Sequence, residues 1–262
     1  MIKKIISLIK ESYWKAWYNY INKSDKDNEL TFMNYGYAYY SPLELKSKDE
    51  KNRYQIQLYD KIVKAIPSPI EKSDMLEVGC GRGGGANYIS EYLSPKSLDG
   101  IDICKPAIDF CRKNRIRGIS NVFFNEGDAM RIPHSNDFFD AVINIESSHR
   151  YPDMPKFLGE VKRVLKQEGY FSFVDFRATE RIPELDDLMS FSGMNLLEEE
   201  VVTPEVLKAL ELDNARKLDM IARLVPKILH KPAREFASVI GSASYNSLID
   251  GKREYKRYLL KK

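Results

Sequence analysis

The stretch Asp74-Met75-Leu76-Glu77-Val78-Gly79-Cys80-Gly81-Arg82-Gly83-Gly84-Gly85 decides the fold of this 262-residue chain. An apolar run closes on a carboxylate, and five glycines then follow within seven positions. Glycine allows a positive φ and lets a ligand lie against the backbone, so the pattern predicts a strand, a tight turn and a helix. A flexible linker is the alternative, but the helix-like segment 86–93 that follows argues against it. We therefore expect a loop that binds a small molecule.

The charge beside this loop bears on which cofactor it holds. Gly79, Gly81 and Gly84 also fit the dinucleotide fingerprint, so a nicotinamide or flavin cofactor has to be weighed. A pyrophosphate, however, would meet the negative charge of Glu77 in a partly desolvated turn. S-adenosylmethionine (SAM) carries no phosphate and brings an ammonium and a sulfonium. Glu77 therefore favours SAM over a dinucleotide.

Two more acids follow later strands. Asp102 lies in the apolar run 98–103, about where a carboxylate would accept both ribose hydroxyls. Asp128 follows the run 122–125 and is placed to accept from an adenine amino group. Because the carboxyl ends of parallel strands meet at one edge of a sheet, the three acids should converge there. Together they predict SAM as the cofactor.

Alternating strand and helix patterns predict an α/β fold with a doubly wound, seven-stranded, mostly parallel sheet of the Rossmann-like kind. Helices are expected between the first five strands, among them Met154–Gln167, ended by Gly169. The last strand should insert antiparallel. The expected strands are Met75–Val78, Leu98–Ile103, Val122–Asn125, Phe139–Ile145, Tyr170–Phe176, Leu196–Val202 and Glu254–Leu260.

The chain should form one domain, 49–262, preceded by an N-terminal helix and aromatic lid segment, 1–48. Residues 203–253 are too many for an ordinary connection and should build a helical roof over the substrate. In 1–21 the apolar side chains share one helical face, so this helix either packs as a lid or touches lipid or a partner. The tyrosine-rich run 32–40 either covers a substrate or packs on the core.

Composition limits the functional class. A net charge of +3 and the lack of zinc-finger or RNA-binding motifs predict no nucleic-acid partner. Cys80, Cys104 and Cys111 form no Cys-x-x-Cys pair, which suits free thiols in a reducing compartment. With no apolar run long enough to span a membrane, we expect a cytoplasmic protein that can touch the membrane surface through 1–21. No acids are paired as a magnesium site requires, so no metal is expected. The oligomeric state stays open.

Four motifs in order, Leu76–Gly83, Gly100–Asp102, Gly127–Ala129 and Phe139–Val142, resemble those of class I SAM-dependent methyltransferases. More narrowly, 81–86, 144–152 and 203–207 are similar to the phthiotriol/phenolphthiotriol dimycocerosate methyltransferases and related natural-product O-methyltransferases. The resemblance implies O-methylation of a hydroxyl on a hydrophobic polyketide, lipid or lipopeptide. It also implies cofactor contacts; the full set that we expect is Glu77, Gly79, Cys80, Gly81, Asp102, Ile103, Asp128, Ala129, Asn144 and Glu146.

Transfer of a methyl group to an alcohol depends on alignment and exclusion of water, and a base within hydrogen-bond reach helps. His149 follows the fourth strand and is the predicted general base; a structural or substrate-orienting role is the alternative. Glu146 could orient His149, bind the methionine end of the cofactor, or make a structural hydrogen bond to nearby backbone. The candidates for lining the substrate pocket are Tyr39, Tyr59, Tyr151 and Arg177. Carbon or nitrogen methylation, or a SAM-binding protein without catalysis, are the competing functions.

Overall fold

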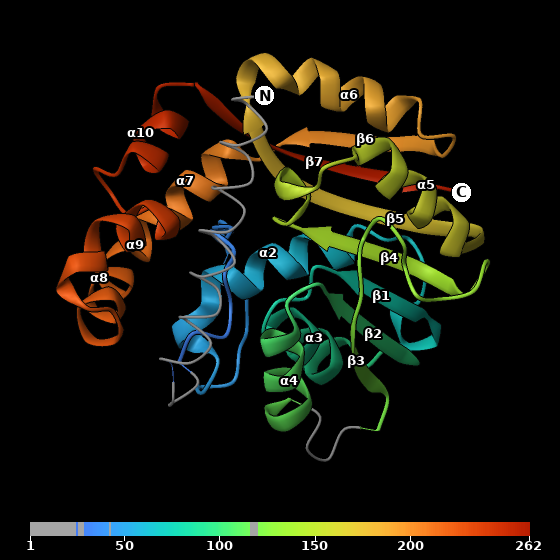
Figure 1. Cartoon of the computed structure of the whole chain (residues 1–262), viewed down its shortest axis with the longest axis horizontal. Coiled ribbons are helices and arrows are strands. Elements are labelled where there is room, and N and C mark those ends of the chain that lie inside the picture. Colours follow the sequence, from blue (N-terminus) through green and yellow to red (C-terminus); the bar gives the residue numbers. More distant parts are fainter. Residues whose placement is uncertain (1–24, 26–28, 42, 116–119) are drawn as a thin grey trace.

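The computed structural model describes residues 25, 29–41, 43–115 and 120–262. Their centre is one seven-stranded sheet of order β3-β2-β1-β4-β5-β7-β6 (Figure 1). β7 runs antiparallel to both β5 and β6, and the other pairings are parallel. This confirms the predicted α/β sheet and its inserted last strand. The strands are β1 Asp74–Val78, β2 Ser97–Asp102, β3 Val122–Glu126, β4 Phe139–Ile145, β5 Leu165–Ala178, β6 Asn195–Val201 and β7 Arg253–Lys261.

Helices cover both faces of the sheet, and the insertion 203–253 forms four of them, α7 to α10. Figure 1 shows these four grouped on the side of the sheet to which the arrowhead of β4 points. None of the described helices is long and apolar enough to cross a membrane. The predicted helix 1–21 lies outside the described residues. The helices are α2 Arg53–Lys64, α3 Gly84–Tyr88, α4 Lys105–Asn114, α5 Met154–Val164, α6 Ile182–Ser190, α7 Thr203–Leu212, α8 Asn214–Leu224, α9 His230–Ala237 and α10 Ala243–Ile249.

Alternation along β1 divides the core into two layers. Met75 points to the layer that contains Leu58 and Ile62 of α2. Leu76 and Val78 point to the opposite layer, which contains residues of α5 and α6. All five side chains are almost fully buried. Period-two alternation thus gives the sheet an apolar covering on each face, as a doubly wound fold requires.

Two predicted helix features are wrong. No helix connects β3 to β4; the chain instead makes a bridge between Asp128 and Arg131 and then turns. α5 ends at Val164 rather than at Gln167, because β5 already begins with Leu165 pairing to β4. Gly169 therefore lies in an irregular part of β5, where a Cβ would come within 2.9 Å of a backbone oxygen. Its missing side chain serves close strand packing rather than a helix end.

Candidate active site

The glycine loop follows β1 and turns into α3. Gly79, Gly81 and Gly83 have φ of +80°, +52° and +71°, a region that L side chains rarely adopt. A Cβ on Gly79 would lie 2.4 Å from Oγ of Ser147, and one on Gly85 would lie 1.8 Å from the ring of Tyr59. The loop is therefore tightly packed between the end of β4 and α2, as a binding loop requires and a linker does not.

The three predicted acids lie around this loop. Asp102 accepts hydrogen bonds from the amides of Gly81 (2.9 Å) and Cys104 (2.8 Å). Buried Glu77 accepts from the hydroxyl of Tyr59 at 2.7 Å, and burial raises the pKa of this acid to about 8. Exposed Asp128 accepts from the amide of Met130 at 2.8 Å. In the described parts of the chain no Lys or Arg forms an ion pair with these acids. Without a ligand Glu77 therefore holds its proton at neutral pH, and a cationic ligand such as SAM would favour its ionised form.

The other predicted cofactor residues next to these acids differ in exposure. Cys80 is buried within the loop, and Ala129 is nearly buried beside Asp128. Ile103 follows β2 and leaves 73% of its surface exposed, although it is a large apolar side chain. An exposed apolar residue directly after Asp102 is available for contact with a ligand.

The end of β4 is fastened to the end of β1. Nδ2 of the fully buried Asn144 lies 2.9 Å from the carbonyl oxygen of Val78, 2.8 Å from Oγ of Ser147 and 3.1 Å from the hydroxyl of Tyr151. The hydroxyl of Tyr151 in turn lies 2.9 Å from that of Ser147. Asn144 and Tyr151 thus hold the segment after β4 against the glycine loop. These contacts set where the following residues lie.

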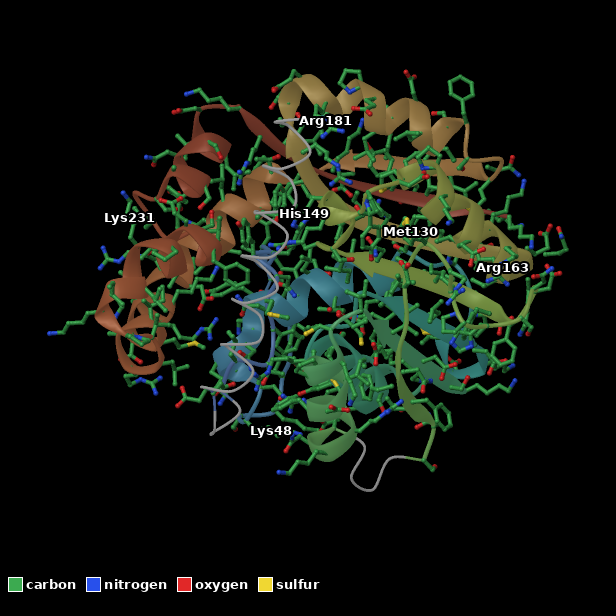
Figure 2. All side chains as sticks on the ribbon, viewed as in Figure 1. Lys48, Met130, His149, Arg163, Arg181 and Lys231 are labelled. Atoms are coloured by element: carbon green, nitrogen blue, oxygen red, sulfur yellow. The ribbon has the colours of Figure 1, made fainter. Side chains whose placement is uncertain are left out.

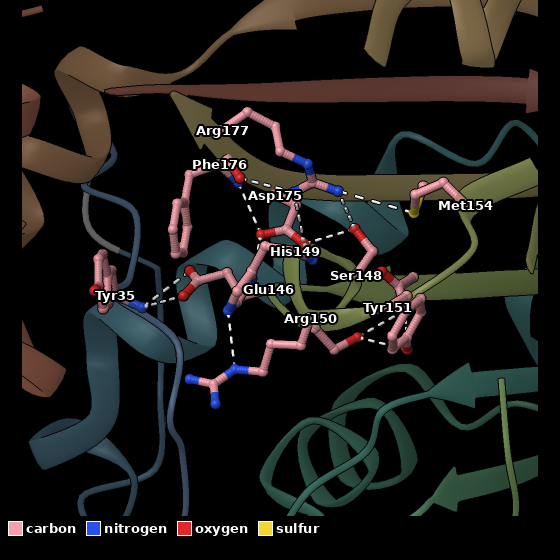
Figure 3. Close-up of polar contacts among 12 residues, drawn as sticks. Tyr35, Glu146, Ser148, His149, Arg150, Tyr151, Met154, Asp175, Phe176 and Arg177 are labelled. Atoms are coloured by element: carbon pink, nitrogen blue, oxygen red, sulfur yellow. Dashed lines mark hydrogen bonds and ion pairs between the residues drawn. The ribbon is translucent and has the colours of Figure 1, made fainter. Parts of the chain in front are cut away.

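His149 is oriented by a carboxylate that sequence reasoning missed (Figure 3). Nδ1 of His149 lies 2.8 Å from Oδ1 of Asp175, and its backbone amide donates to Oδ2 of the same acid at 2.8 Å. Ser148 adds a hydrogen bond of 2.6 Å to that acid. Asp175 comes from β5 and is completely buried. Asp175 is the one acid in the otherwise mostly apolar run 170–176, and this feature of the sequence could have marked it as a functional residue.

Several charges keep Asp175 ionised. Burial raises the pKa of this acid, but the charge and hydrogen bond of His149, with Arg177 and Ser148, outweigh that effect and hold the pKa well below its usual range. The ionised Asp175 accepts a hydrogen bond from Nδ1–H of His149, which leaves Nε2 as the ring nitrogen that can accept. Nε of Arg150 donates to that Nε2 at 3.1 Å.

Arg177, a predicted substrate residue, lies behind this pair. One of its nitrogens, Nη1, is 3.3 Å from Oδ2 of Asp175, and the other, Nη2, donates to Oγ of Ser148 at 2.8 Å. The side chain is 9% exposed. These contacts make Arg177 a support for the acid that orients His149.

Glu146 does not take the orienting role. Its carboxylate accepts from the backbone amide of Tyr35, with both oxygens within 3.1 Å, and burial raises its pKa to about 8. Its φ of +49° is unusual for a residue other than glycine. The ring of Tyr35 stacks on Phe176 at 5.8 Å, and Phe176 stacks on His149 at 4.4 Å. Glu146 thus holds Tyr35, and the ring of Phe176 lies between Tyr35 and His149.

The tyrosine-rich segment lies over the glycine loop and also joins the core. A Cβ on Gly81 would meet Cε of Met33 at 2.7 Å. Tyr35 and Tyr37 are buried in the core cluster, so core packing accounts for these two rings. Tyr39 donates a hydrogen bond of 2.9 Å to Asp60 of α2, and Tyr59, as described above, bonds to Glu77.

Figure 2 summarises where the histidine lies in the fold. His149 is near the middle of the view, between the strands and the helices α7–α10. Arg163 and Lys231 lie at opposite outer sides. His149 is partly exposed and follows the carboxyl end of β4, the edge at which ligands of open α/β sheets bind.

Comparison with known proteins agrees with this geometry. The family model described as "Methyltransferase domain" matches residues 71–223. A fatty-acid O-methyltransferase from Mycolicibacterium smegmatis is 36% identical over 248 residues, which cover 93% of this chain and 88% of the relative. The phthiotriol/phenolphthiotriol dimycocerosates methyltransferase of Mycobacterium tuberculosis is 32% identical over 252 residues, 95% of this chain and 92% of that protein.

A solved structure shows the same fold. The geranyl diphosphate methyltransferase in complex with SAM has a TM-score of 0.65 at 17% identity and covers 88% of this chain and 99% of its own. The seven-stranded sheet, the glycine loop after β1 and the acids at the strand ends are all present in the chain described above. SAM is accordingly its cofactor. The chain belongs to the class I SAM-dependent methyltransferases.

Proposed function

We propose that this enzyme O-methylates a hydroxyl of a hydrophobic, lipid-like metabolite, with His149 as general base. The observation that carries the proposal is the pair of His149 with the buried Asp175, next to the glycine loop. Relatives named for fatty-acid and phthiotriol substrates support the lipid class and the oxygen acceptor. Carbon methylation at an acidic C–H would also use a base, so it is the name of the fatty-acid O-methyltransferase, rather than the histidine, that favours oxygen as the acceptor.

The residues of this chain have separate tasks in the reaction. SAM supplies a methyl group that is activated by its sulfonium. Glu77, Gly79, Gly81, Asp102 and Asp128 would hold it, since their carboxylates and bare backbone suit a cation that lies close to the chain. The substrate hydroxyl would give its proton to Nε2 of His149 as its oxygen bonds to the methyl carbon; the carbon–sulfur bond would break, and the donor would leave as a neutral thioether. Asp175 stabilises the imidazolium that results.

For the hydroxyl to reach Nε2, the hydrogen bond from Arg150 has to break. The guanidinium of Arg150 lies on an exposed side chain, so water can solvate it when it leaves. In the absence of substrate the same hydrogen bond satisfies the lone pair of Nε2. We infer that substrate and Arg150 compete for this nitrogen.

The proposal extends to the parts that surround the site. The N-terminal helix and aromatic lid segment, 1–48, and the roof insertion, 203–253, would enclose the substrate, and a cavity lined by both 29–35 and α8–α9 supports this. The enzyme would act in the cytoplasm, which suits its free cysteines, and meet the membrane surface through 1–21, whose sequence is apolar on one face and rich in lysine.

A substrate panel tests the proposal. The purified full chain is incubated with trideuteromethyl-labelled SAM and matched long-chain alcohols, hydroxy acids, amines and unsaturated lipids. We expect label on the oxygen of a hydroxyl, located by fragmentation in the mass spectrometer. Label on carbon or nitrogen alone would overturn O-methylation, and the absence of any turnover with the whole panel and with lipid extracts would count against an active enzyme.

A further inference from the structure

A cavity of about 100 Å³ lies between the segment 29–35, α2, α8 and α9. Its wall is largely apolar and includes Leu30, Phe32, Met33, Ile221, Leu224 and Phe236. Such a wall suits a hydrocarbon chain. Four charged side chains line this wall. Asp25 pairs with Arg82, Glu29 with Arg223 and Arg216 with Asp213. Among the described residues the fourth side chain forms no ion pair. That side chain is Lys217 of α8.

Lys217 is buried without an acidic partner. Only 8% of its surface is exposed, and its ammonium donates one hydrogen bond, to the backbone oxygen of Ala237 at 3.2 Å. Within the described ranges no carboxylate forms an ion pair with it. An ammonium has three donors, so two remain for a ligand. Burial also lowers the pKa of Lys217 to about 8, the mark of a cation that lacks compensation.

The neighbouring charges are already engaged. Asp213 makes a two-pronged pair with Arg216, with both distances 2.6 Å. Glu146 binds the amide of Tyr35, whose ring centre lies 5.6 Å from the ammonium of Lys217. These are the charged groups whose fields reach Lys217. A buried, incompletely bonded charge in an apolar cavity is costly, and proteins keep such charges where a ligand of opposite sign binds.

We propose that Lys217 binds the carboxylate of a long-chain hydroxy acid, and that this carboxylate anchors the substrate while a separate hydroxyl is methylated. This inference rests on the proposed O-methylation. Lys217 faces one end of a series of rings, Tyr35 then Phe176, and His149 stands at the other end. The anchor is therefore distinct from the base. A carboxylate at His149 itself would need no base, because it is already ionised at neutral pH.

The test compares acids with their neutral methyl esters. Long-chain hydroxy acids with the hydroxyl at different positions, and the methyl esters of the same acids, are assayed with the wild type, Lys217→Met and Lys217→Arg. We expect Lys217→Met to raise KM for the acid by about 10- to 100-fold, the loss of a charged hydrogen bond, with KM for the ester and kcat nearly unchanged. Lys217→Arg keeps the charge and should keep the preference for the acid.

A binding measurement avoids any dependence on turnover. Calorimetry with a saturated fatty acid that carries no hydroxyl should show binding to the wild type and weaker binding to Lys217→Met by a similar factor. Lys208→Met is the matched control, because Lys208 is an exposed residue of α7 that lies 3.6 Å from Glu211. This variant should bind like the wild type, and SAM affinity should be the same for all variants.

The outcomes separate the two proposals. Equal KM for acid and ester in the wild type, or an equal rise for both in Lys217→Met, would overturn the anchor and leave O-methylation standing. A product methylated on its carboxylate would also overturn the anchor. Failure of every hydroxyl to be methylated, while another atom is, would overturn the proposed function itself. A methoxy acid with a free carboxylate is the expected product.

Discussion

His149 and Asp175 come from segments 26 residues apart in the chain, and their pairing gives the imidazole a defined role. The backbone amide of His149 and the hydroxyl of Ser148 bind the same carboxylate, so the acid is held from three sides. The ring also stacks on Phe176. Position, tautomer and ring plane are thus set before any substrate arrives, which is the condition for efficient proton transfer.

Replacing the base tests this role. His149→Ala should lower kcat by about 10²–10⁴-fold, because the hydroxyl then loses its proton to water alone. SAM affinity, measured by calorimetry, should stay close to that of the wild type. Unchanged turnover in this variant would remove His149 from the chemistry.

Asp175→Asn offers a check that does not remove the ring. The amide can present its NH₂ group to Nδ1, which would favour the proton on Nε2 and leave no acceptor for the substrate. We expect most of the loss seen in His149→Ala, with the double variant no slower than His149→Ala alone. Additive losses in the double variant would mean that the two residues act separately.

Burial of Glu146 predicts a pH dependence of stability. The pKa of Glu146 is raised to about 8 in the fold from an ordinary 4.5, so between these values the folded protein holds a proton that the unfolded chain has lost. The free energy of unfolding should therefore fall as the pH rises through this window, and Glu77 acts in the same direction. Asp175 contributes with the opposite sign, because its pKa is lowered in the fold. Its contribution to the free energy of unfolding is lost only as the pH falls into the acid range.

Glu146→Gln should flatten this dependence, by up to about 1.4 kcal/mol per pH unit. Urea unfolding at several pH values between 5 and 8 measures it. Glu44→Gln is the control, since Glu44 is exposed, and its slope should match that of the wild type. An identical slope in Glu146→Gln would show that Glu146 is ionised throughout this range.

Among the structural elements, the glycine loop and α3 have the least room for change. Gly85→Ala would place a methyl group where the ring of Tyr59 lies, so we expect a loss of about 1–3 kcal/mol in the free energy of unfolding and weaker SAM binding. Gly159→Ala in α5 is the matched control, because nothing lies within 4 Å of its Cβ position. It should be neutral or stabilising, by up to about 1 kcal/mol. Equal stability of the two variants would contradict close packing at the loop.

The elements that sequence patterns predicted well are those with a strict period. β1, β4 and the α5 stripe follow from alternation or from a spacing of three and four residues. The connection from β3 to β4 was predicted wrongly as a helix. Gly127 and Pro133 interrupt the run whose local composition had suggested one. The end of α5 was placed too late, since pairing of Leu165 with β4 competes with the helix, and such pairing depends on a distant strand.

In the molecule as a whole, two segments that lie far apart in the sequence line the same cavity. The segment 29–35 and helices α8 and α9 line it together. Ala233 is a small, buried part of this wall, so Ala233→Leu should fill part of the cavity and raise KM for long acyl substrates at least about tenfold. Short-chain substrates and SAM should bind as before. Equal KM values across all chain lengths would place the acyl chain outside this cavity.

The local order of residues was enough to establish the α/β class, the glycine loop, the cationic cofactor and His149 as the candidate base. Each of these depends on neighbours within a few positions: an apolar period, a glycine spacing, or an acid directly after a strand. Asp175, Lys217 and the cavity between 29–35 and α8–α9 could be found only in the folded chain. The low pKa of Asp175, the charge of Lys217 (unpaired within the described residues) and the shape of the cavity arise from burial and from contacts between distant segments. Neither burial nor such contacts can be read from adjacent residues.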